Sequence, residues 1–257
     1  MPIERVPPSL DRLPRAIYPR SETLPADSLA RGHVHPWAQL SWASSGVLVV
    51  TTPQASHLAP PQRAVWVPPG LPHEVTSSSR TEMRSLYIDP AATAFAPAQC
   101  RVLSVTPLAR ELLQAVSALP PEYDADGADG RLVAVLLDQL AKLPEAGFSL
   151  PWPADARLGA ICRALTAHPD DRRDMDAWAS AHGLTARTLN RQFVAATGLT
   201  FGKWRRLARL LAALTSLEDG HGVTATALEC GYDSPSAFIA AFREAFGVTP
   251  GEFLKHR

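Results

Sequence analysis

The sequence of 257 residues lacks several features that would assign it to a broad class of proteins. No apolar run approaches the length of roughly 18 residues that a membrane-spanning helix requires. The Pro- and Arg-rich stretch over residues 1–30 contains no apolar signal core. Ser/His/Asp, Cys/His and phosphate-loop patterns are also missing. We therefore expect a cytoplasmic protein without a membrane partner and without those catalytic chemistries.

Cysteine is scarce, and the net charge is zero. Cys100, Cys162 and Cys230 are odd in number and widely spaced, which excludes a disulfide framework and a zinc knuckle and fits a reducing compartment. The 25 basic residues balance the 25 acidic ones, so a charged surface must arise from local clustering. The length supports two domains, each with a core of its own.

The sequence does contain a repeat in its C-terminal part. Gly183 to Trp204 and Gly231 to Phe253 share their apolar and glycine positions at a separation of about 49 residues. The matched pairs are Leu189 with Phe238, Phe193 with Phe242, Gly198 with Gly247, Thr200 with Thr249, Gly202 with Gly251 and Trp204 with Phe253. A period of this length with several helical segments indicates duplication of a small helical unit.

Each copy has the pattern of a helix-turn-helix. A short apolar helix, expected over 175–181 or 224–229, runs into a glycine that can end it in the left-handed conformation. An oxygen-bearing residue suited to capping the second helix follows, namely Thr185 in one copy and Asp233 or Ser234 in the other. The second helix of such a unit can enter a DNA major groove. A plain helical bundle is the alternative interpretation.

Local charge favours DNA over the plain bundle. Between Thr185 and Leu214 there are no acidic residues and six basic ones, which are Arg187, Arg191, Lys203, Arg205, Arg206 and Arg209. On the second helix, long polar side chains share the face opposite to the apolar residues, and Arg and Asn are residue types that reach guanine and adenine edges bidentately. The residues predicted to contact double-stranded DNA are Arg187, Thr188, Asn190 and Arg191.

The second copy carries a weaker signal for base reading. Three basic and six acidic residues lie between Thr215 and Arg257. The helix face of Ser236, Ile239 and Ala240 is almost free of long polar side chains. We predict that Ser236 and Ile239 contact DNA by positioning the protein or by reading thymine methyl groups.

The last hundred residues resemble the AraC/XylS family of transcriptional regulators. The resemblance rests on the two helix-turn-helix units, on a long connecting helix expected from Phe201 to about Leu217, and on the closing run from Gly231 to Phe253. It implies tandem recognition helices in successive major grooves and a homodimer on paired DNA sites. Members of the family often carry an Arg near the position of Ala240.

The N-terminal half has a different pattern. Short apolar stretches at 38–42, 47–51, 64–67 and 84–88 alternate with Pro, Gly and Ser turns, which is typical of a small antiparallel barrel or jelly roll. Two amphipathic helices are expected over 106–119 and 131–143. A linker is expected over 144–153.

Two motifs in this half resemble those of the cupin fold, Gly32 to Gln39 (GHVHPWAQ) and Pro68 to His73 (PPGLPH). Residues 33, 35 and 39 have equal parity, so on one strand they would point into a barrel. In metal-binding cupins the matching set is two His, one Glu and a third His. Gln39 stands in the place of the Glu, and a neutral amide is a poorer ligand for a divalent cation.

Three interpretations of this set remain open. His33, His35, Gln39 and His73 are polar groups of an effector pocket, ligands of a divalent metal, or hydrogen-bonded residues of the barrel lining. No cofactor is expected with certainty, and a divalent metal is the one candidate.

These observations predict an α+β fold in which a cupin-like β-barrel precedes connecting helices and an all-α tandem helix-turn-helix domain. The expected domains are 1–105, 106–153 and 154–257. The predicted function is a sequence-specific transcription factor that responds to a small-molecule effector through its cupin-like domain. The alternative is a metal-dependent cupin enzyme fused to a DNA-binding module, which requires a full metal set. Because Gln39 replaces the anionic ligand, we expect a regulator and no enzyme.

Overall fold

The computed structural model of the chain describes residues 3–6, 10, 12–77, 80–93 and 97–255. Contacts divide the chain into two units. The N-terminal unit comprises Met1–Thr52 with His57–Ser149, and the C-terminal unit comprises Pro53–Ser56 with Leu150–Arg257. In the described part of the chain, no helix is both long and apolar enough to cross a bilayer.

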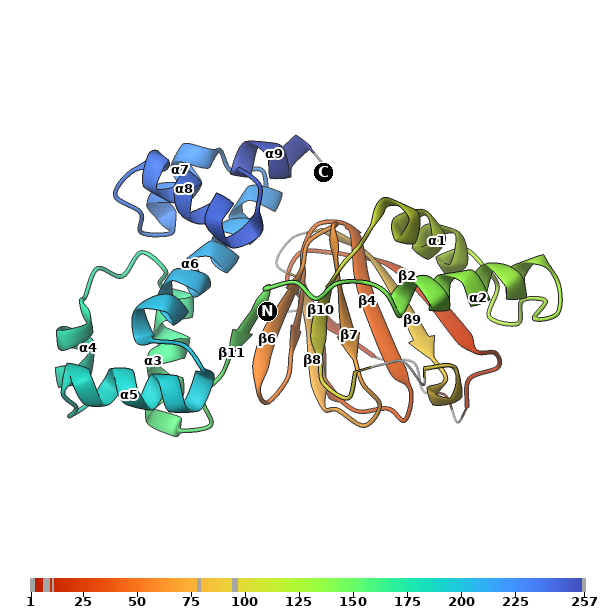
Figure 1. Ribbon diagram of the computed structural model, residues 1–257, viewed down its shortest axis with the longest axis horizontal. Helices are drawn as coiled ribbons and strands as arrows, with labels where there is room; N and C mark the ends of the chain where they lie inside the picture. Colours follow the sequence, from red (N-terminus) through yellow and green to blue (C-terminus); the bar gives the residue numbers. More distant parts are fainter. Residues whose placement is uncertain (1–2, 7–9, 11, 78–79, 94–96, 256–257) are drawn as a thin grey trace. The chain divides into compact units, whose positions relative to one another are not determined.

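The N-terminal unit is a β-sandwich (Figure 1). One sheet has the strand order β1-β3-β8-β5-β6-β11 and the other has the order β10-β7-β4-β9-β2. The strands are β1 (Ile3–Arg5), β2 (Ile17–Leu24), β3 (Ser28–His33), β4 (Ala38–Ser45), β5 (Leu48–Thr51), β6 (Ala55–Ala59), β7 (Arg63–Val67), β8 (His73–Ser77), β9 (Thr81–Ile88), β10 (Arg101–Ser104) and β11 (Ser149–Pro151). The four predicted apolar stretches correspond to β4, β5, β7 and β9, and the expected barrel or jelly roll takes the form of two sheets packed as a sandwich.

Strand alternation gives the two faces of the five-stranded sheet different chemistry. Leu40, Trp42 and Leu86 belong to an apolar core shared with helices α1 (Pro107–Ser117) and α2 (Ala128–Leu140). The neighbouring Gln39 and Ser41 project to the opposite face, which is the interior of the sandwich, and hydrogen-bond to each other. The helices thus cover the outer face of this sheet, and the inner face keeps a buried polar patch.

Both helices of this unit form close to where the amphipathic pattern predicts them. Thr106 caps α1 by accepting a hydrogen bond from the backbone N–H of Ala109, and Pro107 occupies the first turn. A short 3-10 helix, η1 (Pro90–Ala92), follows β9. By their contacts α1 and α2 belong to the sandwich unit and do not form a separate stretch.

The expected linker over 144–153 is partly built into the sheets. The backbone N–H of Ser104 donates to Pro144 O at 2.8 Å, and the N–H of Ala146 donates to Val102 O at 2.8 Å. Residues 149–151 then form β11. The segment has the composition of a linker, but its backbone groups are paired as in an edge strand.

The C-terminal unit is all helical after β11. Its helices are α3 (Ala156–Ala167), α4 (Met175–Ala181), α5 (Ala186–Thr197), α6 (Phe201–Glu218), α7 (Val223–Glu229), α8 (Pro235–Phe246) and α9 (Pro250–Lys255). The aromatic and aliphatic residues matched by the repeat form its core. Leu189, Phe193, Trp204, Phe238 and Phe242 are all fully buried.

The two helix-turn-helix units, α4–α5 and α7–α8, use the same backbone devices, so the predicted duplication is confirmed. Gly183 and Gly231 have φ values of 69° and 74°. The residue after each glycine donates back into the preceding helix, Leu184 N to Ala179 O and Tyr232 N to Ala227 O, both at 2.9 Å.

Candidate functional site

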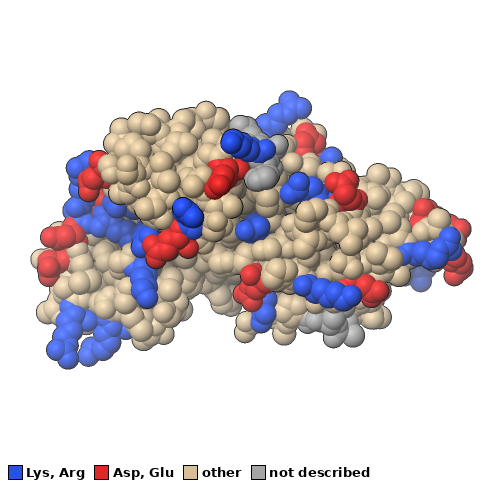
Figure 2. All heavy atoms as spheres, turned by 45° about the horizontal axis from the view of Figure 1, so that its top comes forward, with Lys and Arg blue, Asp and Glu red and all other residues tan. Residues whose placement is uncertain are grey.

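Helix α5 exposes its cations on the face opposite to the core. Arg187 and Arg191 are exposed, whereas Leu189 and Phe193 are buried. No hydrogen bond or ion pair engages either guanidinium within the part of the chain that the structure describes. Figure 2 shows basic side chains gathered over the part of this unit that holds α4 and α5. The two arginines are therefore available to an external ligand.

The other two predicted residues of α5 also serve the local structure. Asn190 Oδ1 accepts a hydrogen bond from the backbone N–H of Phe201 at 3.0 Å, so this amide ties α5 to the start of α6. Thr188 Oγ1 accepts from the hydroxyl of the capping residue Thr185 at 3.0 Å. The amide nitrogen of Asn190 is the part of this side chain that base reading could use.

Helix α8 presents a different surface at the corresponding positions. Ser236, Ile239 and Ala240 are exposed and occupy the places of Arg187, Asn190 and Arg191. Arg243, which is not among the predicted DNA contacts, is also exposed and lies one helical turn beyond Ile239. The surface over α7 and α8 in Figure 2 is largely uncharged. The only long basic side chain on the exposed face of α8, Arg243, lies late in the helix.

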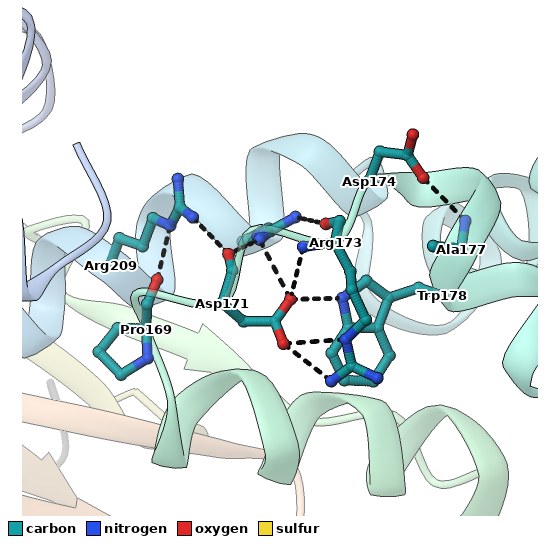
Figure 3. A network of polar contacts seen from close by, with 8 residues as sticks. Pro169, Asp171, Arg173, Asp174, Ala177, Trp178 and Arg209 are labelled. Atoms are coloured by element: carbon teal, nitrogen blue, oxygen red, sulfur yellow. Dashed lines mark hydrogen bonds and ion pairs between the residues drawn. The ribbon is translucent and has the colours of Figure 1, made fainter. Parts of the chain in front are cut away.

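Three arginines of the predicted basic block have structural partners in the C-terminal unit. Arg209 donates from Nε to Pro169 O at 2.8 Å and from Nη2 to Asp171 O at 2.9 Å (Figure 3). Arg205 donates to the backbone oxygens of Asp171 and Arg173. Arg206 forms an ion pair with Glu244. Of the six basic residues, Arg187, Arg191 and Lys203 remain without such partners within the described residues.

The loop between α3 and α4 is held by Asp171. Its carboxylate accepts hydrogen bonds from the backbone N–H and Nε of Arg173, both at 2.9 Å, and from Trp178 Nε1 at 3.2 Å (Figure 3). The Arg173 guanidinium also lies 3.8 Å above the Trp178 ring. Burial raises the pKa of Asp171, but the hydrogen bonds from Arg173 and Trp178 outweigh this and hold the pKa below its ordinary value.

In the N-terminal unit, the three predicted histidines converge. The imidazoles of His33, His35 and His73 place their candidate ligand atoms within 4.8 Å of one another. They do so by a route other than the predicted single strand. The register between β3 and β8 shifts between Ala30 and His33, and His35 lies in the loop before β4.

Gln39 links this cluster to the five-stranded sheet. Its side-chain oxygen lies 2.9 Å from His35 Nε2 and 3.0 Å from His73 Nε2, and its amide nitrogen lies 2.9 Å from Ser41 Oγ and 3.2 Å from Ser85 Oγ. His73 is 1% exposed, and burial lowers its pKa to about 4, so its imidazole is neutral at pH 7.

The proton of the neutral His73 ring belongs on Nδ1, which lies 2.9 Å from Leu71 O. Its Nε2 is then an acceptor that faces another acceptor, the Gln39 oxygen. Turning the amide end for end resolves this conflict, because the NH₂ group then donates to both imidazoles and the oxygen accepts from the two serine hydroxyls. His35, His73, Gln39, Ser41 and Ser85 therefore form a hydrogen-bond network that is complete without any ion.

The space beside this network is small. The adjoining cavity has a volume of about 10 Å³ and is lined by Arg20, His33, Gln39 and Tyr87 among others. That is room for one water molecule or ion. A cation there would have no anionic ligand in the histidine–Gln39 set, and Arg20, which is paired with Glu22, lines the same cavity. The set offers three imidazoles and no anionic ligand, and the hydrogen bonds of His35 and His73 are satisfied without an ion.

Two family profiles match the chain. Residues 178–256 match a helix-turn-helix domain, and residues 16–143 match an AraC-like ligand binding domain. The chain is 32% identical to the HTH-type transcriptional regulator NimR of Escherichia coli (strain K12) over 222 residues, which cover 86% of this chain and 81% of NimR. It is 33% identical to the regulator RipA of Corynebacterium glutamicum over 103 residues, which cover 40% of this chain and 31% of RipA.

Solved structures also resemble the chain. ToxT from Vibrio cholerae O395 aligns with 94% of this chain and 98% of its own at 11% identity and a TM-score of 0.40. The DNA-binding domain of AdpA, solved in complex with a target DNA, aligns with 37% of this chain and 88% of its own at 28% identity and a TM-score of 0.36.

Proposed function

The chain belongs to the AraC family of helix-turn-helix transcriptional regulators, and from this premise we propose which of its residues read DNA. It is a DNA-binding regulator with a ligand-binding N-terminal domain, and its homologues are regulators and not enzymes. Within that function, we propose that α5 provides the main base contacts and that α8 positions the protein. The exposed and unpaired guanidinium groups of Arg187 and Arg191 support this proposal most strongly.

The proposal is tested with the operator that nuclease protection identifies. Arg187→Ala should weaken operator binding by about 1–3 kcal/mol and relax the preference at one base pair, because a bidentate contact to a guanine is lost. Arg31→Ala removes an exposed arginine of β3 in the N-terminal unit; it is the matched control and should leave operator affinity unchanged. If Arg187→Ala retained both affinity and base preference, α5 would not be the base-reading helix.

For the histidine set, we propose that His35, Gln39 and His73, with His33 beside them, act as a polar network that joins the two sheets without a metal. The continuous hydrogen bonds from His35 and His73 through Gln39 to Ser41 and Ser85 support this proposal. Purified protein should carry no stoichiometric metal in elemental analysis. Near-stoichiometric metal that His73→Ala removes, in a protein that stays folded, would overturn the proposal.

We also propose that the protein is a homodimer that binds paired DNA sites. Helices α1 and α2 each leave an apolar side chain in solvent, with Leu108 54% and Val135 46% exposed. Val135→Lys adds charge at an exposed position, so the fold should survive while association weakens. Sedimentation that finds only monomer at micromolar concentration, with and without operator DNA, would contradict the proposal.

A further inference from the structure

A second cavity of the N-terminal unit is large enough for an organic ligand. Its volume is about 360 Å³, against about 10 Å³ beside the histidines. Small-molecule sites in proteins span roughly 300–1,000 Å³. The cavity lies at the edge of the apolar core, between β10 and the C-terminal end of α2. Its lining combines Trp66, Leu103, Leu140 and Leu143 with one ion pair, Arg101 and Glu145.

The ion pair in this cavity engages a single nitrogen of Arg101, and both of its side chains are partly exposed. Arg101 Nη1 lies 3.0 Å from Glu145 Oε2, with the two side chains 40% and 58% exposed. Such an exposed pair contributes little to stability. The two terminal nitrogens of a guanidinium, Nη1 and Nη2, present a pair of N–H groups to a carboxylate, so a carboxylate ligand can take the place of Glu145 on Arg101.

We propose that this cavity binds a small organic carboxylate with a compact apolar body. Arg101 binds the carboxylate in the place of Glu145, and the apolar body packs against Leu103, Leu140 and Leu143. The inference rests on the proposed function, in which the N-terminal unit responds to an effector, and it assigns to that effector a site and a chemical class.

Glu145 connects the cavity to the segment that leads to the DNA-binding helices. Residues 144–146 run antiparallel to β10, with Leu103 and Glu145 as bridge partners. The chain then enters β11, and the C-terminal unit begins at Leu150. A ligand that displaces Glu145 from Arg101 therefore removes one tether from the segment immediately before the DNA-binding unit.

Calorimetry on the full chain tests the ligand class directly. The probes are 3-phenylpropanoate and hexanoate, each compared with its neutral amide, which has nearly the same shape. The acids should bind at least about tenfold more tightly than the amides, because a charge-assisted hydrogen bond is lost in each amide. Equal affinity of acid and amide, or no binding of either acid at millimolar concentration, overturns the proposal.

Variants assign any binding to this cavity. Arg101→Gln should weaken binding of the acid at least about tenfold, and Glu145→Gln should strengthen it about threefold, because the competing carboxylate is removed. The control is Arg31→Gln, which breaks an exposed ion pair with Glu4 away from the cavity and should change nothing. Wild-type affinity in Arg101→Gln overturns the proposal.

The operator affinity of each variant is measured separately without ligand. If the acids fail to bind while Arg101→Gln binds its operator normally, the assignment of this cavity fails and the DNA-reading function stands. If Arg101→Gln loses the operator together with its cooperative thermal unfolding, Arg101→Lys replaces it. Arg101→Lys keeps the charge but loses the fork, so it should bind the acid more weakly than the wild-type chain, and wild-type affinity in this variant overturns the proposal.

Discussion

In the first helix-turn-helix, Thr185 caps α5 and Gly198 ends it with a φ of 74°; in the second, Ser234 caps α8 and Gly247 ends it with a φ of 77°. The exposed faces nevertheless differ. Arg187, Asn190, Arg191 and Val194 of α5 correspond to Ser236, Ile239, Ala240 and Arg243 of α8. The comparison shows that the capping residues, the turn glycines and the buried side chains preserve the helix-turn-helix scaffold in both copies. The exposed positions are free to diverge in function.

The two units also differ in what surrounds their turns. Nothing lies within 4 Å of a methyl group added at Gly183. A methyl group at Gly231 would lie 2.9 Å from both Asp170 Cα and Pro169 O. These atoms belong to the loop that Asp171 and Arg209 hold in place (Figure 3). The second turn is thus packed against the loop that precedes the first helix-turn-helix, and the first turn faces open space.

The largest effects should come from the shared core. Phe193→Ala and Phe242→Ala should each lower the free energy of unfolding by about 3–5 kcal/mol, because both rings are fully buried at matching positions of the repeat. Denaturant unfolding monitored by circular dichroism measures both values. A near-neutral result for one of them would show that the two scaffolds are not equivalent.

The turn glycines should separate the units. Gly183→Ala and Gly231→Ala both place a side chain at positive φ, which costs about 1–2 kcal/mol. Gly231→Ala should cost clearly more, since its methyl group meets backbone atoms of the 169–170 segment. If thermal unfolding showed the same loss of stability for both variants, the 169–170 segment would move aside to accommodate the methyl group. The packing around the second turn would then contribute little to stability.

The Asp171 network should matter for stability more than the exposed Glu229–His221 pair of the second unit. Asp171→Asn should cost about 1–3 kcal/mol, since charged hydrogen bonds to a largely buried carboxylate are weakened. Glu229 is half exposed and pairs with His221 at 3.0 Å. Glu229→Gln should therefore change the free energy of unfolding by less than about 0.5 kcal/mol.

The contribution of Asp171 should also depend on pH. Because folding lowers the pKa of Asp171, its stabilisation is present above the unfolded pKa near 3.9 and is lost as the pH falls through the lower folded pKa. The difference in unfolding free energy between the wild-type chain and Asp171→Asn should therefore shrink in acid. A difference that stays constant down to the lowest pH at which the protein folds would contradict this account.

A smaller effect is expected from the remaining unpaired cation of the first unit. Lys203 is exposed in the first turn of α6, after the cap Thr200. If Lys203 contacts a phosphate, Lys203→Ala should weaken binding about uniformly across DNA sequences and reduce the salt slope by about one. Lys255→Ala in α9 is the matched control. A sequence-dependent loss for Lys203→Ala would indicate a base contact instead.

The helical half could be predicted from sequence almost to the residue, and the sandwich could not. Helices α4 and α5 are marked by local signals such as Thr185 and Gly183, which act within a few positions. Short strands such as β8 and β10 are paired with residues far away in the sequence, and no local pattern marks them. Parity groups only His33, His35 and Gln39, and the resemblance to the cupin motifs adds His73. The register shift after Ala30 and the loop position of His35 depend on tertiary pairing, which neither signal contains.

The basic block between Thr185 and Leu214 contains arginines that stabilise the fold and are not available to DNA. Arg205 and Arg209 looked like members of a basic patch, but they donate to backbone oxygens between 32 and 40 residues earlier in the chain. Nothing near these arginines in the sequence indicates that loop. Arg243, by contrast, could have been found by aligning the two copies position by position, since it replaces Val194 on the exposed face.

The claim that the two recognition helices have different tasks is tested most directly by titrating one operator with Arg191→Ala and Ser236→Ala. Both residues are exposed, and both substitutions leave the buried core unchanged. We predict that Arg191→Ala weakens operator binding by about 1–3 kcal/mol and that Ser236→Ala weakens it clearly less. A loss for Ser236→Ala as large as that for Arg191→Ala would contradict the account.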